Sequence, residues 1–224
     1  MNDVADGVRA ASLAVAALMP IVNPLGSAPI FLSMTADLPT AARRMLPRRV
    51  AWNSFLLLSA AMLVGSHVLH FFGISVPIVR VGGGLLVIAN GWRLLNAADV
   101  PPAAEKLAPA DVWEREVARR AFYPLTFPLT VGPGSLSIAI TIGAGISMRP
   151  TSGALDVLSD LIGVAIVALS VSLSYRFAGR VIAFVGETGA TIFVRLCSFI
   201  LLCVGVSIMW GGLADLIRPM MSTV

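Results

Sequence analysis

The stretch NPLGS at residues 23–27 interrupts an apolar segment that covers about residues 8–34. Proline has no amide donor and its ring clashes with the preceding helical turn, and glycine weakens a helix further. A second interruption, GPGS at residues 132–135, lies in the apolar segment at about residues 121–146. Within lipid, an interrupted helix is tolerated only where protein buries it or where it lines a wet cavity. The two stretches therefore predict two broken transmembrane helices that face the protein interior.

The composition assigns the chain to the membrane proteins. Its 224 residues are 57% hydrophobic and 12% charged, and the mean hydropathy is +0.89. Soluble domains carry about 45–50% apolar and about 25% charged residues, so this chain has too little charge to face water. The net charge of +4 is typical of Lys/Arg-rich cytoplasmic loops, and no motif for nucleic-acid binding accompanies it.

The chain length suits about six spans of roughly 20 residues with short loops. Six apolar segments are expected at about residues 8–34, 50–72, 78–95, 121–146, 154–175 and 190–217. The polar residues 96–120 between the third and fourth segments predict a solvated linker that ends in a short charged helix. We expect an all-α polytopic fold in which residues 1–98 form a first three-span repeat, 99–120 a cytoplasmic linker and 121–224 a second three-span repeat.

The two halves carry matching signals in the same order. Each begins with a broken segment, and each later shows a glycine followed by an arginine and a long apolar run, at Gly73 and Arg80 in the first half and at Gly186 and Arg195 in the second. Because three is an odd number of spans, two such halves in series have opposite orientations. This is the inverted-repeat arrangement of many secondary transporters, with helices 1 and 4 broken.

The distribution of Lys and Arg predicts the orientation in the membrane. The loops after the first, third and fifth segments hold eleven of these residues and the opposite side holds three, with Arg80 and Arg195 set aside because they lie within or at the ends of spans. Cytoplasmic loops carry the excess of positive charge. Both termini are therefore predicted to be periplasmic.

The two interruptions also predict a binding site near the middle of the membrane. The N-terminus of a half-helix offers free N–H groups to an anion such as a carboxylate, and carbonyl groups freed by a break can hold a cation or an ammonium group. Such a pocket suits a small zwitterion, for example an amino acid. The predicted substrate-binding residues are Asn23, Pro24, Gly26, Ser27, Thr126, Thr130, Gly132, Pro133, Gly134 and Ser135. The alternative is two proline kinks that only aid helix packing.

Charged residues inside the spans give further hypotheses. Asp160 lies about two turns into the fifth segment and is a candidate for coupling to protons or sodium, unless the span begins later and leaves it at the interface. Arg80 and Arg195 are expected to extend their side chains to the lipid headgroups. The run Gly82-Gly83-Gly84 is expected to allow close helix packing.

The sequence predicts no cofactor and no metal site. An enzyme is not expected, because we find no set of nucleophile, base and metal ligands. A secondary transporter is favoured, and the alternative is a channel or a structural membrane partner without a transport cycle. The lipid bilayer and a small solute are the expected partners, nucleic acid is not, and a homo-oligomer is left open.

Three motifs in order resemble one known family. They are NPLGSAPIF at residues 23–31, FGISVP at 72–77 followed by RVGGGLL at 80–86, and PLTFPL at 124–129 followed by GPG at 132–134. These motifs resemble the MarC family of integral membrane proteins over roughly residues 10–215. One departure follows Arg195, where the family usually has Met-Gly and this chain has Cys197-Ser198.

The resemblance implies a six-span protein of the bacterial inner membrane, grouped with amino-acid exporters of the lysine-exporter type. Some relatives are described as neutral amino-acid transporters, although for most members the substrate is not established. We therefore expect a transporter of small neutral amino acids or similar solutes, acting as exporter or importer.

Overall fold

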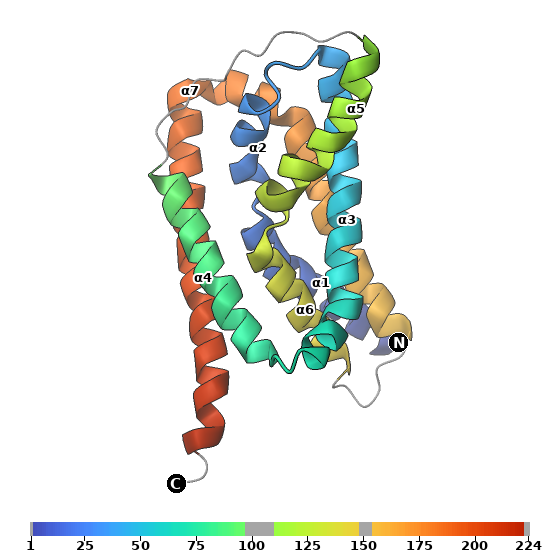
Figure 1. The fold of residues 1–224 in the computed structure, drawn as a ribbon, viewed down its shortest axis with the longest axis vertical. Coiled ribbons are helices and arrows are strands. Elements are labelled where there is room, and N and C mark those ends of the chain that lie inside the picture. The colour runs from blue at the N-terminus through green and yellow to red at the C-terminus, as the bar shows by residue number, and fades with distance from the viewer. Residues whose placement is uncertain (1, 97–109, 148–153, 222–224) are drawn as a thin grey trace.

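The computed structural model describes residues 2–96, 110–147 and 154–221, and within them it contains helices and no strands. The elements are α1 (Asn2–Val22), α2 (Pro24–Ser33), α3 (Thr40–Phe71), α4 (Val76–Leu95), α5 (Ala110–Arg120), η1 (Ala121–Thr130), α6 (Pro133–Ser147) and α7 (Ala154–Met221) (Figure 1). The predicted all-α membrane fold is confirmed. The first half of the linker expected at 99–120 lies outside the described residues, and its second half is the charged helix α5.

Several of these helices are long and apolar enough to cross a membrane. Five such stretches occur in the described residues, at Asp6–Ser33, Thr40–Phe71, Val76–Leu95, Ala154–Phe184 and Thr191–Arg218. A sixth is obtained if Arg115–Thr130 and Pro133–Ile146, which meet at 74°, count as one bent span. The six predicted apolar segments each overlap one of these stretches, while the 3+3 division remains a prediction.

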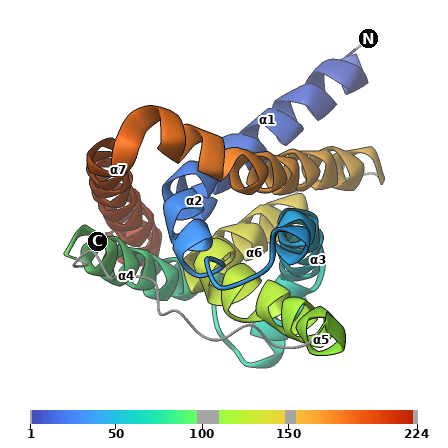
Figure 2. The same cartoon turned by 90° about the horizontal axis from the view of Figure 1, so that it is seen from above.

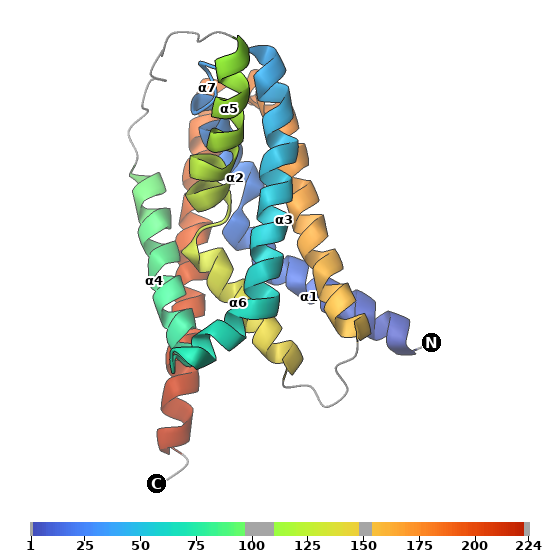
Figure 3. The same ribbon diagram turned by 45° about the vertical axis from the view of Figure 1, so that its right-hand side comes forward.

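The helices α2 and α6 lie in the middle of the bundle (Figures 1 and 2). On one side of them α4 packs against the C-terminal half of α7, and on the other side lie α3 and α5. Figure 3 shows α5 running beside α3 and leading down towards α6. The second parts of both broken segments, α2 and α6, thus lie together in the middle of the bundle, which positions the site described below.

Glycine brings α4 and the C-terminal half of α7 into backbone contact. A Cβ atom added at Gly84 would lie 2.6 Å from the amide nitrogen of Met209, and one added at Gly205 would lie 2.7 Å from that of Ile88. Real Cβ atoms do not approach other atoms so closely, so larger residues at these positions would force the helices apart. Of the Gly82-Gly83-Gly84 run, Gly83 and Gly84 are buried in helix contacts, whereas Gly82 faces open space.

The long helix α7 contains a break that separates two spans. Gly186 has φ 78° and ψ 168°, which is not helical and which only glycine adopts readily. The predicted fifth span ended near residue 175, but the helix continues beyond it to this glycine. Loss of apolar character marks where a helix leaves lipid and does not mark where it ends, because Arg176 and Arg180 are exposed and helical. Gly73, in the turn between α3 and α4, also has positive φ, at 68°.

The arginines near the ends of spans differ in their surroundings. Arg80 on α4 forms an ion pair with Asp215 on α7, with Nη1 2.8 Å from Oδ2 and both side chains about one-third exposed. Arg195 is exposed. Extension towards the headgroups therefore fits Arg195, while Arg80 is held by a carboxylate that the sequence pattern did not associate with it.

Candidate functional site

The first break arises from a single dipeptide. The ring of Pro24 disfavours helical backbone at the residue before it, and Asn23 responds with φ 45° and ψ 58°, the left-handed conformation that asparagine tolerates better than most residues. The side-chain Oδ1 of Asn23 then accepts a hydrogen bond from the amide of Gly26 at 3.1 Å. The asparagine thus ends α1 and caps α2 in one step.

The second break is longer and uses two prolines. Tyr123 and Phe127 both have extended backbone, with φ near −120°, because each precedes a proline. The hydroxyls of Thr126 and Thr130 donate at 2.6 Å to the carbonyls five residues earlier, and the amide of Val131 donates to the Thr126 carbonyl at 2.8 Å. These bonds satisfy polar groups that the irregular turns of η1 leave without regular helical partners.

Helix α6 begins at the second break with its N-terminus inside the protein. Its first helical hydrogen bond runs from the amide of Leu136 to the carbonyl of Gly132, at 3.1 Å. The amides of Gly134 and Ser135 therefore precede the hydrogen-bonded ladder, as the first amides of any helix do. The positive end of the helix dipole lies at the same place.

A cavity of about 50 Å³ lies between the two breaks. Its lining combines residues of both broken segments with residues of α4 and of the C-terminal half of α7: Ile21, Val22, Asn23, Gly26, Ser27, Ile30, Val87, Asn90, Leu94, Pro128, Leu129, Thr130, Gly132, Gly134, Ser135, Ser198 and Leu201. At roughly 10–15 Å³ for each water, it has room for about three to five water molecules. The starts of α2 and α6 thus meet at one small cavity with polar groups in its wall.

Tyr175 on α7 joins the two breaks beside this cavity. Its hydroxyl donates to Oγ of Ser27 at 3.0 Å and lies 2.8 Å from Oγ1 of Thr130. Its ring is 2% exposed and stacks on Phe31 with centroids 4.4 Å apart. Through this side chain, α7 is connected both to α2 of the first broken segment and to η1 of the second.

Most of the predicted binding residues gather at the cavity. Seven of the ten line it, namely Asn23, Gly26, Ser27, Thr130, Gly132, Gly134 and Ser135. Pro24, Thr126 and Pro133 do not line it, although each belongs to one of the breaks. Thr126 is fully buried and its hydroxyl is occupied by the carbonyl of Ala121. That these residues bind a substrate remains a prediction.

Asp160 is buried, at 3% exposure, and does not line the cavity. It lies on α7 fifteen residues before Tyr175, which at 1.5 Å per residue is about 22 Å along the helix. The expectation that it lies within a span rather than at an exposed interface agrees with its burial.

Sequence reasoning did not identify three polar residues at or beside the cavity as parts of the site. Residue 175 entered the sequence analysis only as the end of a span and Ser198 only as a departure from the family pattern, and Asn90 was given no role in a site. None of them lies near a helix breaker in the sequence, and helices that are apolar all round do not reveal which face is internal. Only the packing of α4 and α7 against the breaks brings these side chains to the site.

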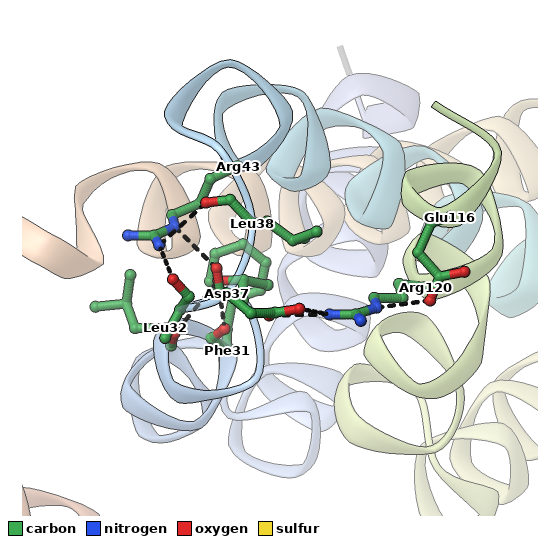
Figure 4. A network of polar contacts seen from close by, with 9 residues as sticks. Phe31, Leu32, Asp37, Leu38, Arg43, Glu116 and Arg120 are labelled. Atoms are coloured by element: carbon green, nitrogen blue, oxygen red, sulfur yellow. Dashed lines mark hydrogen bonds and ion pairs between the residues drawn. The ribbon is translucent and has the colours of Figure 1, made fainter. Parts of the chain in front are cut away.

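A polar network ties the broken segments together at the opposite end of α2 (Figure 4). The guanidinium of Arg120 binds both carboxylate oxygens of Asp37, at 2.7 and 2.9 Å, and its Nε donates to Glu116 at 2.8 Å. Arg43 donates to the carbonyls of residues 35, 36 and 38, just after α2. By the Lys/Arg distribution, this is the predicted cytoplasmic side.

Comparison with known proteins gives a consistent family assignment. Residues 9–217 match the family described as "MarC family integral membrane protein". Inner membrane protein MarC of Escherichia coli O1:K1 / APEC is 31% identical over 219 residues, which cover 95% of this chain and 98% of the relative. The protein of the same description from Escherichia coli strain K12 has the same identity and coverage. Among solved structures no significant match is found.

Proposed function

This chain belongs to the MarC family of integral membrane proteins, and from that membership and the cavity between its helix breaks we propose that it is a secondary transporter of small neutral amino acids or similar solutes. One observation carries the proposal. Two interrupted helices from different halves of the chain place their new N-termini at one enclosed, partly polar cavity. Packing alone would not require both breaks to open onto the same space.

The chemistry of the cavity favours a zwitterion. The amides at the start of α6 and the helix dipole behind them attract a carboxylate. Asn23, Asn90 and Ser198 add neutral donors and acceptors, and no charged side chain lines the cavity. A neutral amino acid has one carboxylate and one ammonium group and no further charge. It can therefore bind to these polar groups without bringing a net charge into the cavity.

An inverted repeat is part of the proposal, and two features support it. The positive-φ glycines among the described residues, Gly73 and Gly186, occupy corresponding places in the two halves. In addition, α6, the second part of the second broken segment, packs on α3, as α2, the second part of the first, packs on α7. Rocking of such halves against each other gives alternating access to a site at their interface.

The cavity must widen before a solute can enter. A space with room for only a few water molecules is too small for an amino acid and its hydration shell. The Asp37–Arg120 ion pair joins the two broken segments on the predicted cytoplasmic side. We propose that it closes that side and separates when the site opens to the cytoplasm. Asp160, buried within the α7 span, is the proposed coupling group for protons or sodium.

The test is flux of radiolabelled glycine, alanine and serine into proteoliposomes, under a proton gradient and under a sodium gradient. Asn23→Gly removes the capping amide while keeping the positive φ accessible, and Ser135→Ala removes a cavity hydroxyl. Ser12→Ala is the matched control, because Ser12 is exposed and its hydroxyl bonds only within its helix, to the carbonyl of Val8.

Saturable flux with KM raised about tenfold or more in the two cavity variants, and unchanged in the control, supports the proposal. A loss of one hydrogen bond to a charged group, about 1.5 kcal/mol or more, corresponds to that factor. Absence of flux for all three amino acids, in either direction and under either gradient, contradicts the amino-acid proposal. Flux that does not saturate with concentration indicates a channel instead.

A further inference from the structure

A second and much larger concavity lies on the surface, away from the breaks. It has a volume of about 1100 Å³ and is bounded by α3, the α5–η1 junction and the first span of α7. Its lining residues are Arg44, Met45, Arg48, Arg49, Ala51, Trp52, Asn53, Phe55, Ala118, Ala121, Ala165, Ala168, Leu169 and Ser172. It is larger than the roughly 300–1000 Å³ typical of small-molecule pockets and opens to the surface, so it does not suit a small solute. We call it the α3–α7 groove.

One end of the α3–α7 groove is strongly basic. Arg44 and Arg48 are neighbours on the surface of α3, because they lie four residues apart in the helix, and Arg49 lines the groove beside them. Arg44 and Arg48 are exposed, and none of the three has a hydrogen bond or an ion pair with a described residue. Arg43, which directly precedes Arg44, instead donates its hydrogen bonds to backbone carbonyls. Three guanidinium groups are thus available to an anion at this end.

The rest of the groove is apolar and lies deeper along the spans. Trp52 is eight residues beyond Arg44, about 12 Å further along α3 at 1.5 Å per residue. Trp52 is 60% exposed and Leu169 58% exposed, although both lie in stretches long and apolar enough to span a membrane. Ala165 and Ala168 line the α7 side of the groove with small side chains, which leave room along this wall. The groove is therefore positively charged at one end and lined by apolar side chains along the rest of its length.

We propose that the α3–α7 groove binds an anionic glycerophospholipid, with the phosphate held by Arg44, Arg48 and Arg49 and one acyl chain lying along Trp52 and Leu169. The argument is one of matching chemistry. A guanidinium group can donate two parallel hydrogen bonds to a phosphate, and the acyl chains of a lipid extend away from its phosphate as the apolar lining of the groove extends away from the arginines. Basic pockets between transmembrane helices are suited to anionic headgroups. A zwitterionic lipid would place its own cation near the three arginines and bind less well.

The experiment measures lipid binding to the purified full-length chain in neutral detergent by native mass spectrometry. Phosphatidylglycerol and phosphatidylcholine with identical acyl chains are titrated separately. The test variant is R44Q/R48Q/R49Q, and the matched control is R176Q/R180Q/R195Q, which removes the same charge from exposed positions on α7 outside the groove. Ala165→Trp leaves all charges in place and fills the apolar part.

The expected result is at least tenfold tighter binding of phosphatidylglycerol than of phosphatidylcholine by the wild type and by the control variant. The groove triple variant loses this preference, and Ala165→Trp weakens binding of both lipids. All variants should keep the melting temperature of the wild type in detergent without added lipid, because the substituted positions are exposed or face the groove.

Three outcomes would overturn the proposal. Equal binding of the two lipids by the wild type would show that the arginines do not select a headgroup. Complete displacement of the lipid by glycerol phosphate, at concentrations similar to those of phosphatidylglycerol, would show that no acyl chain is held. A dimer that Ala165→Trp dissociates would assign the groove to a second copy of this chain. None of these measurements needs transport, so their result is independent of the proposed function.

Discussion

The hydroxyl of Tyr175 gives a sharp test of how the two helix breaks are joined. Tyr175→Phe removes this hydroxyl and keeps the ring that stacks on Phe31. The hydroxyls of Tyr175, Ser27 and Thr130 form four short contacts, of which two are with the backbone carbonyls of residues 23 and 125. Since each hydroxyl has one proton, at most three of these four contacts can be hydrogen bonds at the same time. In the variant, Ser27 and Thr130 keep those carbonyl partners, so no buried group is left without a bond.

The magnitude follows from this count. Removing one hydroxyl proton removes one net hydrogen bond, which is about 0.5–1.5 kcal/mol of unfolding free energy. Hydrogen bonds between transmembrane helices average about 0.6 kcal/mol in double-mutant cycles. We therefore expect Tyr175→Phe to cost about 1 kcal/mol. Tyr175→Leu should cost about 3 kcal/mol or more, because it also removes a buried aromatic ring and its stacking.

The assay is reversible unfolding in mixed micelles of the wild type, Tyr175→Phe, Ser27→Ala and the double variant. Ser27→Ala is a suitable partner in the cycle, because the carbonyl of Asn23 retains the amide of Ser27 at 3.0 Å. The expected coupling energy is about 0.5–1 kcal/mol. A coupling of zero, or a cost of Tyr175→Phe as large as that of Tyr175→Leu, would refute the bridge between α2, η1 and α7.

Five further substitutions test other parts of the fold and the proposed cycle. Arg120→Gln and Asp37→Asn should each cost about 1.5–3 kcal/mol, since each breaks a half-buried charged hydrogen bond, and the double variant should cost less than their sum in unfolding measurements. Asp160→Asn should abolish accumulation driven by a gradient while sparing exchange of labelled for unlabelled solute, as measured in proteoliposomes. Gly73→Ala and Gly186→Ala should each cost about 1 kcal/mol or more in unfolding measurements, because both have positive φ and an added Cβ meets nothing within 4 Å. Gly186→Ala should cost more, because φ 78° with ψ 168° is a conformation that only glycine adopts readily; a cost of zero for either substitution would contradict the role of backbone conformation at these turns.

The parts of the structure that follow from proline and glycine were predictable from the sequence. Pro24 and the Gly132-Pro133-Gly134 run act on the backbone within one turn of themselves, so their effect does not depend on which helices pack nearby. The same holds for Gly186, whose positive φ separates the last two spans. Hydropathy predicted the spans because lipid acts on every residue of a span in the same way.

The side-chain partners were not predictable in the same way. Tyr175 and Ser27 are 148 residues apart in the sequence, and Arg80 and Asp215 are 135 apart. A contact of that separation depends on how helices are rotated about their own axes. An amphipathic helix reports this rotation through its apolar stripe, but helices that are apolar all round do not.

The contrast between the two breaks indicates what the fold demands of them. The first needs one left-handed asparagine and a capping side chain, whereas the second needs ten residues of irregular turn and two buried threonine hydroxyls. If the breaks served only to kink helices, the second break would bury many backbone N–H and C=O groups outside regular helix and would produce nothing more than the kink that the first break produces with one residue. Both leave the start of a helix facing the same cavity, and this shared outcome, reached by different local chemistry, agrees with the binding site proposed between the two breaks.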